Sequence, residues 1–221
     1  MGPGARSFCY SLQAVFSLHP VIDTSYTGGD LWFVFENIGA LEGLMPEATR
    51  AQLGSYIRAV PDFPKAGILF RDITPLLACP TTFRQSIVDM AEPFRGSRVD
   101  LVAAAEARGF IFAAPLALEL NAGLIPIRKP GKLPAETLSH SYDLEYGSDE
   151  LEIHVDAIPS GSRVLVVDDL LATGGTMDAC CRLIEKAGGT VVGCAFLIEL
   201  AGLSGAQKIA RYRLHSVLKY D

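Results

Sequence analysis

Residues 164–176 constrain the fold of this chain more than any other stretch. They read VLVVDDLLATGGT, which is a β-branched apolar run, two carboxylates at its end, a small loop and the start of a helix. A continuous apolar run of this kind is typical of a central strand that is covered on both faces. Open α/β sheets place their ligands beyond the carboxyl ends of such strands. The stretch therefore predicts an α/β protein with a ligand site beside one of its central strands.

The loop after this strand has the composition of a phosphate-binding turn. Its five residues are Ala172, Thr173, Gly174, Gly175 and Thr176. Successive backbone N–H groups of such a loop can face one anion, and the following helix adds about half a positive charge at its N-terminus. The two glycines lack the Cβ atoms that would obstruct close approach, and the two threonines supply hydroxyl donors. The adjoining Asp168 and Asp169 suit sugar hydroxyls; the alternative is that they only cap the helix.

Other nucleotide-binding motifs are absent from the sequence. No G-x-x-x-x-G-K-[ST] segment occurs, which disfavours a P-loop nucleoside triphosphatase. No G-x-G-x-x-G segment occurs either, which argues against an ordinary dinucleotide-binding fold. The four histidines and five cysteines are scattered without the spacing of a zinc site.

Charge and composition bear on partners and location. With 19 basic and 25 acidic residues the net charge is −6, so we expect neither a nucleic-acid-binding surface nor a polybasic membrane anchor. No apolar run approaches the roughly 20 residues of a membrane-spanning helix. Cys180 and Cys181 lie in an apolar, helix-like stretch, so we interpret both as small buried thiols in a reducing, cytoplasmic setting.

The rest of the chain alternates strands and helices. Helices are predicted over residues 45–60, 82–94, 110–121 and 177–184. Strands are predicted over residues 99–104, 124–128, 151–155, 164–167 and 190–197. Gly123 is expected to cap the third helix. This rhythm indicates a twisted, mainly parallel sheet with helices on both faces.

The first 44 residues differ in character from the rest. Their apolar centre is interrupted by polar residues, and no Ala-x-Ala cleavage site follows, so a secretory signal is not expected. A helical pattern with an early proline begins at Met45. We interpret residues 1–44 as an N-terminal extension of unknown role, dispensable for a functional domain over residues 45–221.

Several segments resemble one enzyme family. Residues 164–176 resemble the phosphoribosyl-pyrophosphate loop of type I phosphoribosyltransferases. Four more segments narrow the resemblance to the adenine phosphoribosyltransferases: FPKAGILFRDITP (63–75), EARGF (106–110), IRKPGKLP (127–134) and YDLEYG (142–147). The resemblance implies a type I phosphoribosyltransferase-like α/β fold with a small hood and a mobile cover loop. It also implies transfer of the phosphoribosyl group of phosphoribosyl pyrophosphate to adenine, giving AMP and pyrophosphate, with Mg²⁺ as cofactor.

The resemblance assigns residues to the sugar and its phosphates. Asp168 and Asp169 would hold the ribose hydroxyls, directly or through the water shell of Mg²⁺. Residues 172–176 would bind the 5′-phosphate. Ala107 and Arg108 would contact pyrophosphate, although an isolated arginine is often no more than a surface charge.

The resemblance also assigns the cover loop. Residues 128–141 are rich in Pro, Gly, Lys and Ser, which is loop composition, and an ordinary solvated loop is the alternative. The implied pyrophosphate contacts in it are Arg128, Lys129 and Lys132. In this family at least one such cation comes from the partner subunit, which implies a homodimer.

The remaining roles concern the base and the proton. The catalytic residues implied are Glu145, Arg108 and Lys132. Glu145 would transfer the proton, unless it is only an exposed acid near a turn. Tyr146 would close over the ribose. The adenine pocket would be made by Leu69, Phe70 and Arg71, with Leu170 as the opposite wall; core packing is the alternative for Phe70.

Two rival functions remain open at this point. One is a regulatory protein that binds phosphoribosyl pyrophosphate without catalysis, and the other is a phosphoribosyltransferase for another nucleobase. The cover loop and Glu145 favour an enzyme. The Phe-Arg-Asp and Leu-Glu-Tyr-Gly stretches favour adenine.

Overall fold

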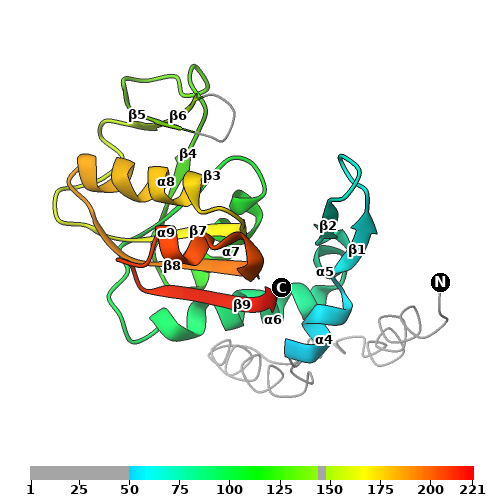
Figure 1. Ribbon diagram of the computed structural model, residues 1–221. Helices are drawn as coiled ribbons and strands as arrows, with labels where there is room; N and C mark the ends of the chain where they lie inside the picture. Colours follow the sequence, from blue (N-terminus) through cyan, green and yellow to red (C-terminus); the bar gives the residue numbers. More distant parts are fainter. Residues whose placement is uncertain (1–49, 144–147) are drawn as a thin grey trace, which may run out of the picture.

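A computed structural model of the chain describes residues 50–143 and 148–221, and its centre is a five-stranded parallel sheet (Figure 1). In spatial order the strands are β4 (Gly123–Ile127), β3 (Leu101–Ala105), β7 (Arg163–Leu171), β8 (Thr190–Leu200) and β9 (Leu214–Tyr220). All four strand pairings are parallel. The apolar run of β7 lies in the middle of the sheet and is fully buried, which confirms the prediction of a central strand covered on both faces.

Helices cover both faces of the sheet, as the sequence predicted. One face carries α4 (Arg50–Ser55), α5 (Thr74–Ala78), α6 (Pro80–Ala91), the 3₁₀ turn η3 (Glu92–Phe94) and α7 (Gly109–Glu119). The other carries α8 (Gly175–Lys186), α9 (Gly205–Lys208) and the hairpin of β5 (Thr137–Asp143) and β6 (Ser148–His154). The short 3₁₀ turn η4 (Ala201–Leu203) follows β8.

The two buried clusters follow the alternation of β7. Leu165 and Val167 belong to the cluster with α6 and α7, whereas Val164 and Val166 belong to the cluster with α8. Successive side chains of a strand point to opposite faces, so one apolar strand supplies both cores. Burial of these side chains fixes the register of β7 and therefore the place where the chain leaves the sheet.

A small hairpin stands apart from the sheet. It consists of β1 (Arg58–Pro61) and β2 (Leu69–Asp72), which pair antiparallel, and it is called the hood below. Figure 1 shows it on the side toward which the parallel strands run. The helix predicted up to residue 60 is therefore wrong beyond Ser55. Val60 precedes Pro61, and helical backbone dihedrals are unfavourable for a residue that precedes a proline. Pairing with β2 supplies the backbone hydrogen bonds instead.

The end of α7 also differs from the prediction. Gly123 is not its cap but the first residue of β4, where it pairs with Leu101. The residue with a left-handed backbone is Asn121, at φ 51°. Asparagine is one of the few residues that adopt this conformation readily, so it ends the helix and glycine is free to begin the strand.

The described cysteines are all buried. They are Cys79, Cys180, Cys181 and Cys194. Burial of Cys180 and Cys181 on the inner face of α8 confirms their interpretation as small apolar side chains. Among the residues that the structure describes, no helix is long and apolar enough to cross a membrane.

Candidate active site

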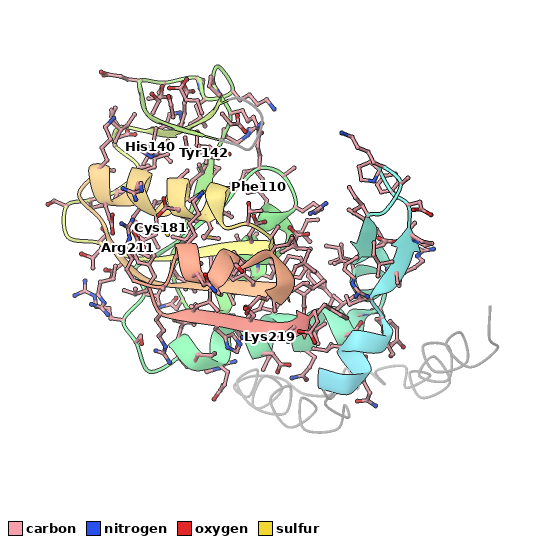
Figure 2. All side chains as sticks on the ribbon, in the orientation of Figure 1. Phe110, His140, Tyr142, Cys181, Arg211 and Lys219 are labelled. Atoms are coloured by element: carbon pink, nitrogen blue, oxygen red, sulfur yellow. The ribbon has the colours of Figure 1, made fainter. Side chains whose placement is uncertain are left out.

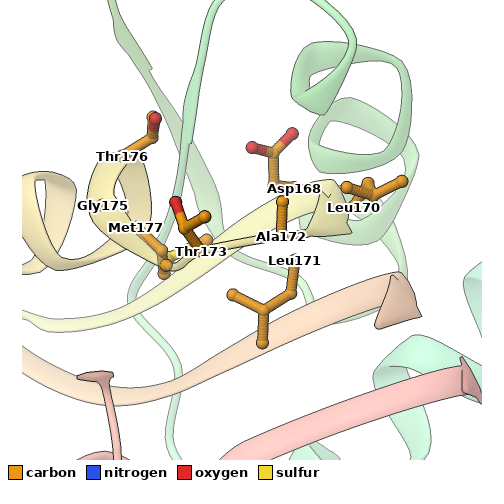
Figure 3. Close-up of a pocket in the computed structure, with 9 residues that line it drawn as sticks. Asp168, Leu170, Leu171, Ala172, Thr173, Gly175, Thr176 and Met177 are labelled. Atoms are coloured by element: carbon orange, nitrogen blue, oxygen red, sulfur yellow. The ribbon is translucent and has the colours of Figure 1, made fainter. Parts of the chain in front are cut away.

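A small concavity of about 90 Å³ lies where the chain leaves β7 and enters α8. Its lining residues are Asp168, Leu170, Leu171, Ala172, Thr173, Gly174, Gly175, Thr176 and Met177. Figure 3 shows the side chains of Asp168, Thr173 and Thr176 projecting to one side, while Leu171 points to the other. The structure thus brings together the predicted phosphate loop, the first acid and Leu170. Residues 172–176 are called the anion loop below.

Local backbone geometry shapes the anion loop. Gly174 has φ 77°, a left-handed conformation that glycine adopts without strain, and it is the N-cap of α8. Within the described residues the N-cap makes no side-chain hydrogen bond, and the carboxylates of Asp169 and Asp168 accept instead from Arg108 and from the backbone N–H of Asp169, which disfavours the alternative that the two acids merely cap α8. The first backbone N–H groups of α8 therefore receive no side-chain cap, as an anion site at a helix N-terminus requires.

The acid pair lies within β7 rather than after it. The strand continues to Leu171, so the prediction that both carboxylates stand at its end is wrong by two residues. Asp169 is 4% exposed and accepts a hydrogen bond from Nε of Arg108 at 2.6 Å. The backbone N–H of Asp169 donates to Oδ1 of Asp168 at 2.8 Å. Burial and the neighbouring Asp169 charge raise the pKa of Asp168 well above its usual range.

Arg108 connects the acid pair to the hood. With Ala107 it forms the exposed turn between β3 and α7. Its guanidinium carbon lies 5.7 Å from the ring centroid of Phe70. Because it pairs with a buried acid, Arg108 is not an isolated surface charge.

The basic segment after β4 gathers around one carboxylate. Glu106 accepts from Nε of Arg128 at 2.6 Å and from Nζ of Lys132 at 2.8 Å. The backbone N–H of Lys129 donates to it at 3.1 Å, while Nζ of Lys129 pairs with Asp149 at 2.6 Å. Hydrogen bonding by Lys132, with help from Arg128, lowers the pKa of Glu106 from 4.5 to about 2. All three predicted loop cations are thus held by acids of the same chain.

Two of these findings depart from the sequence analysis. Residues 128–141 are not loop throughout, because Thr137–Asp143 forms β5 and pairs with β6. Alternation of Leu138, His140 and Tyr142 with smaller polar residues was the available signal for that strand. Glu106 lies in the EARGF segment, but the sequence alone assigns it no role; the three cations at positions 128, 129 and 132 were the available signal that an acid balances them.

Replacing Glu106 with Gln is expected to lower the free energy of unfolding, by an amount that depends on pH. A carboxylate with a depressed pKa stabilises the fold fully above about 4.5 and loses that contribution as the pH falls toward 2. The difference between parent and Glu106→Gln should therefore be largest above pH 4.5 and shrink below it. Urea unfolding across pH 2–7 measures this, with Glu92→Gln as the control for an exposed ion pair. A difference that does not change with pH would contradict the assignment.

The hood carries the residues assigned to adenine. Leu69, Phe70 and Arg71 all lie on β2. The ring of Phe70 meets that of Phe63 edge-on at 5.2 Å and belongs to neither buried cluster, so core packing does not explain it. The guanidinium of Arg71 lies 4.0 Å over the ring of Tyr220, which fastens the hood to the end of β9.

Glu145 and Tyr146 lie outside the described residues, but the strand that leads to them is described. The hydroxyl of Tyr142 donates to Asp149 at 3.2 Å and lies 3.4 Å from the hydroxyl of Thr176. Figure 2 shows Tyr142 between the β5–β6 hairpin and α8. The hairpin is thereby connected to the anion loop.

Fold and site together define a class. The structure has a parallel α/β sheet with paired acids on its central strand and the anion loop directly after that strand. The turn that carries Arg108 and the hood lie at the same site. This is the arrangement that the sequence predicted for a type I phosphoribosyltransferase. Residues 85–216 match the phosphoribosyl transferase domain family.

Relatives identify the family within this class. The chain is 61% identical over 168 residues to the adenine phosphoribosyltransferase of Rhodopirellula baltica, which covers 76% of this chain and 82% of the relative. The crystal structure of adenine phosphoribosyltransferase from Thermoanaerobacter pseudethanolicus superposes with TM-score 0.76 at 53% identity and covers 78% of this chain and all of the other. The crystal structure of the Saccharomyces cerevisiae enzyme, complexed with adenine, superposes with TM-score 0.72 at 38% identity. It covers 76% of this chain and 98% of the other. The chain belongs to the adenine phosphoribosyltransferase family, which confirms the resemblance.

Proposed function

We propose that this chain transfers the 5-phosphoribosyl group of phosphoribosyl pyrophosphate to adenine, giving AMP and pyrophosphate in purine salvage. One observation carries the proposal: the acid pair lies on the central strand β7, the anion loop follows that strand directly, and Arg108 joins the pair to the hood. Relatives that carry the name adenine phosphoribosyltransferase, and one that is complexed with adenine, support the choice of base.

The chemistry requires charge to be balanced at two places. Breaking the bond between the anomeric carbon and pyrophosphate leaves positive charge on the ribose and negative charge on the leaving group. Fixed groups that face these charges lower the barrier because they need no reorganisation. The anion loop would hold the 5′-phosphate, Asp168 and Asp169 the ribose hydroxyls, and Ala107 and Arg108 the pyrophosphate.

The loop cations would exchange partners when substrate binds. Arg128 and Lys132 are tied to Glu106, and Lys129 to Asp149. Pyrophosphate offers these cations more negative charge than a single carboxylate does. We assign Lys132 to the developing charge of the leaving group, since its ammonium is half-exposed and within reach of solvent.

Magnesium is proposed to arrive with the substrate. In the described part of the chain, no group of three or more His, Cys, Asp or Glu side chains could hold a metal ion. Asp168 and Asp169 nevertheless suit the water shell of a hard cation, because they place two acid side chains next to each other with one arginine bonded to Asp169. When bound, the ion would neutralise charge on the pyrophosphate.

The remaining roles follow the family resemblance, and two of them fall on residues outside the described part of the chain. Glu145 would transfer the proton of the purine ring and Tyr146 would cover the ribose. Leu69, Phe70 and Arg71 would read adenine, with Leu170 opposite. A homodimer in the cytoplasm, built on a domain over residues 45–221 with the extension 1–44 dispensable, completes the proposal.

A turnover panel tests the proposal. Adenine, hypoxanthine, guanine, xanthine and orotate are each incubated with phosphoribosyl pyrophosphate and Mg²⁺, and nucleotide formation is measured. Only adenine should give nucleotide, and excess EDTA should abolish it. Turnover of a different base would overturn the assignment of adenine. Binding of phosphoribosyl pyrophosphate with no turnover of any base would indicate the regulatory alternative.

A further inference from the structure

The anion loop rests on a distant part of the chain, main chain against main chain. A Cβ atom built on Gly205, the first residue of α9, would lie only 2.1 Å from the carbonyl oxygen of Ala172 and 3.0 Å from the backbone nitrogen of Gly174. Conversely, a Cβ built on Gly174 would lie 2.7 Å from the carbonyl oxygen of Gly205. Two glycines thus allow the two segments to touch without side chains between them.

The two glycines are required for different reasons. Gly174 has a positive φ, which favours glycine whatever lies nearby. Gly205 is not among the described glycines with positive φ, so its own backbone conformation would accept a side chain. Contact with the anion loop is what excludes one, because Gly205 is buried against it.

We propose that Gly205 is a positioning residue for the 5′-phosphate. The carbonyl of Ala172 and the N–H of Thr173 belong to one planar peptide unit. A group that pushes the carbonyl oxygen must therefore turn that N–H, and the nearby nitrogen of Gly174 would shift with it. By offering bare backbone, Gly205 lets the loop N–H groups face the phosphate. This inference rests on the proposed function of the loop.

Most cations of the pyrophosphate side are held by contacts away from residues 172–174, the part of the anion loop that Gly205 touches; Lys129 alone is linked to the loop, through Asp149 and Tyr142 to Thr176. Arg108 is fixed by Asp169, and the loop cations are fixed by Glu106 and Asp149. A disturbance that begins at Gly205 should therefore weaken recognition of the sugar phosphate and spare recognition of pyrophosphate. A general loss of structure would weaken both.

Gly205→Ala, with Gly202→Ala as the matched control, tests the inference. Within 4 Å, a Cβ built on Gly202 would meet only the backbone carbonyl carbon of Asp221, at 4.0 Å, which is an ordinary van der Waals contact among the described residues. Calorimetry is used to measure binding of ribose 5-phosphate and, separately, of magnesium pyrophosphate. Gly205→Ala should weaken the binding of ribose 5-phosphate about tenfold or more and raise KM for phosphoribosyl pyrophosphate by a similar factor, because small displacements of positioning groups have large effects. The affinity for magnesium pyrophosphate should stay within about twofold of the parent. Gly202→Ala should change none of these values.

A second variant covers the case in which Gly205→Ala does not fold. Ala206 packs against the cluster beneath α8, so Ala206→Gly loosens α9 without adding an atom. This variant should weaken the binding of ribose 5-phosphate about threefold and leave the affinity for magnesium pyrophosphate unchanged. Retained ribose 5-phosphate affinity, or equal loss of both ligands, would overturn the role of Gly205. Failure of the parent enzyme to bind ribose 5-phosphate would instead overturn the proposed function.

Discussion

Replacing Asp169 with Asn should lower kcat/KM for phosphoribosyl pyrophosphate by about 100-fold or more. The amide keeps the shape of the side chain but loses the charge that pairs with Arg108 at 2.6 Å and the carboxylate that would accept ribose hydroxyls. Asp169 is nearly fully buried, so water cannot replace the lost interaction. Steady-state rates at varied phosphoribosyl pyrophosphate measure the effect.

The control for this variant is Asp100→Asn. Asp100 also pairs with arginine, at 2.8 Å from Arg98, but it lies before β3, at the opposite end of the sheet from the anion loop. Its kcat/KM should stay within about twofold of the parent, because the pair lies far from the anion loop and its arginine is mostly exposed. Kinetics of Asp169→Asn that match those of Asp100→Asn would remove Asp169 from the site.

The second large effect is expected for Arg108→Gln. Loss of the guanidinium should lower kcat/KM for phosphoribosyl pyrophosphate by about 100-fold. It should also weaken inhibition by pyrophosphate. It also leaves Asp169 buried without its cation, so the free energy of unfolding should fall by about 1–2 kcal/mol. Inhibition kinetics and urea unfolding give the two values.

Arg98→Gln is the matched control for the arginine. Its side chain is mostly exposed and pairs only at the far end of the sheet, so neither activity nor pyrophosphate inhibition should change. Combining Arg108→Gln with Asp169→Asn adds a sharper criterion. Because the two residues act on each other, the double variant should lose less than the sum of the single losses, whereas strict additivity would contradict their pairing.

Local patterns explain what the sequence predicted correctly. The apolar run of β7 and the spacing of Met177, Cys180, Cys181 and Ile184 on α8 depend on burial alone, and both elements lie where the pattern predicted them, although β7 continues to Leu171. The position of the anion loop follows, because it is the connection between them. The sequence alone therefore places these five residues between the strand and the helix, while their role as a phosphate site stays a prediction.

Long-range contacts account for what was missed. The strand Arg58–Pro61 exists because β2 pairs with it, and a local helical pattern gives no information about that partner. Glu106 binds cations that lie more than 20 residues away along the chain, and Gly205 touches a loop more than 30 residues earlier. Neither residue carries a motif of its own, so only the folded chain reveals what it does.

The pairing of every loop cation with an acid has a consequence for selectivity. Glu106 and Asp149 act as built-in competitors that must be displaced before Arg128, Lys129 or Lys132 can hold an incoming ligand. Chloride or another monoanion would form an ion pair with only one of these cations, which is too little binding energy to displace the carboxylate of Glu106 or Asp149. A compact polyanion gains from several cations at once, so, under the proposed function, we expect the resting protein to discriminate against small ions and to respond to diphosphates.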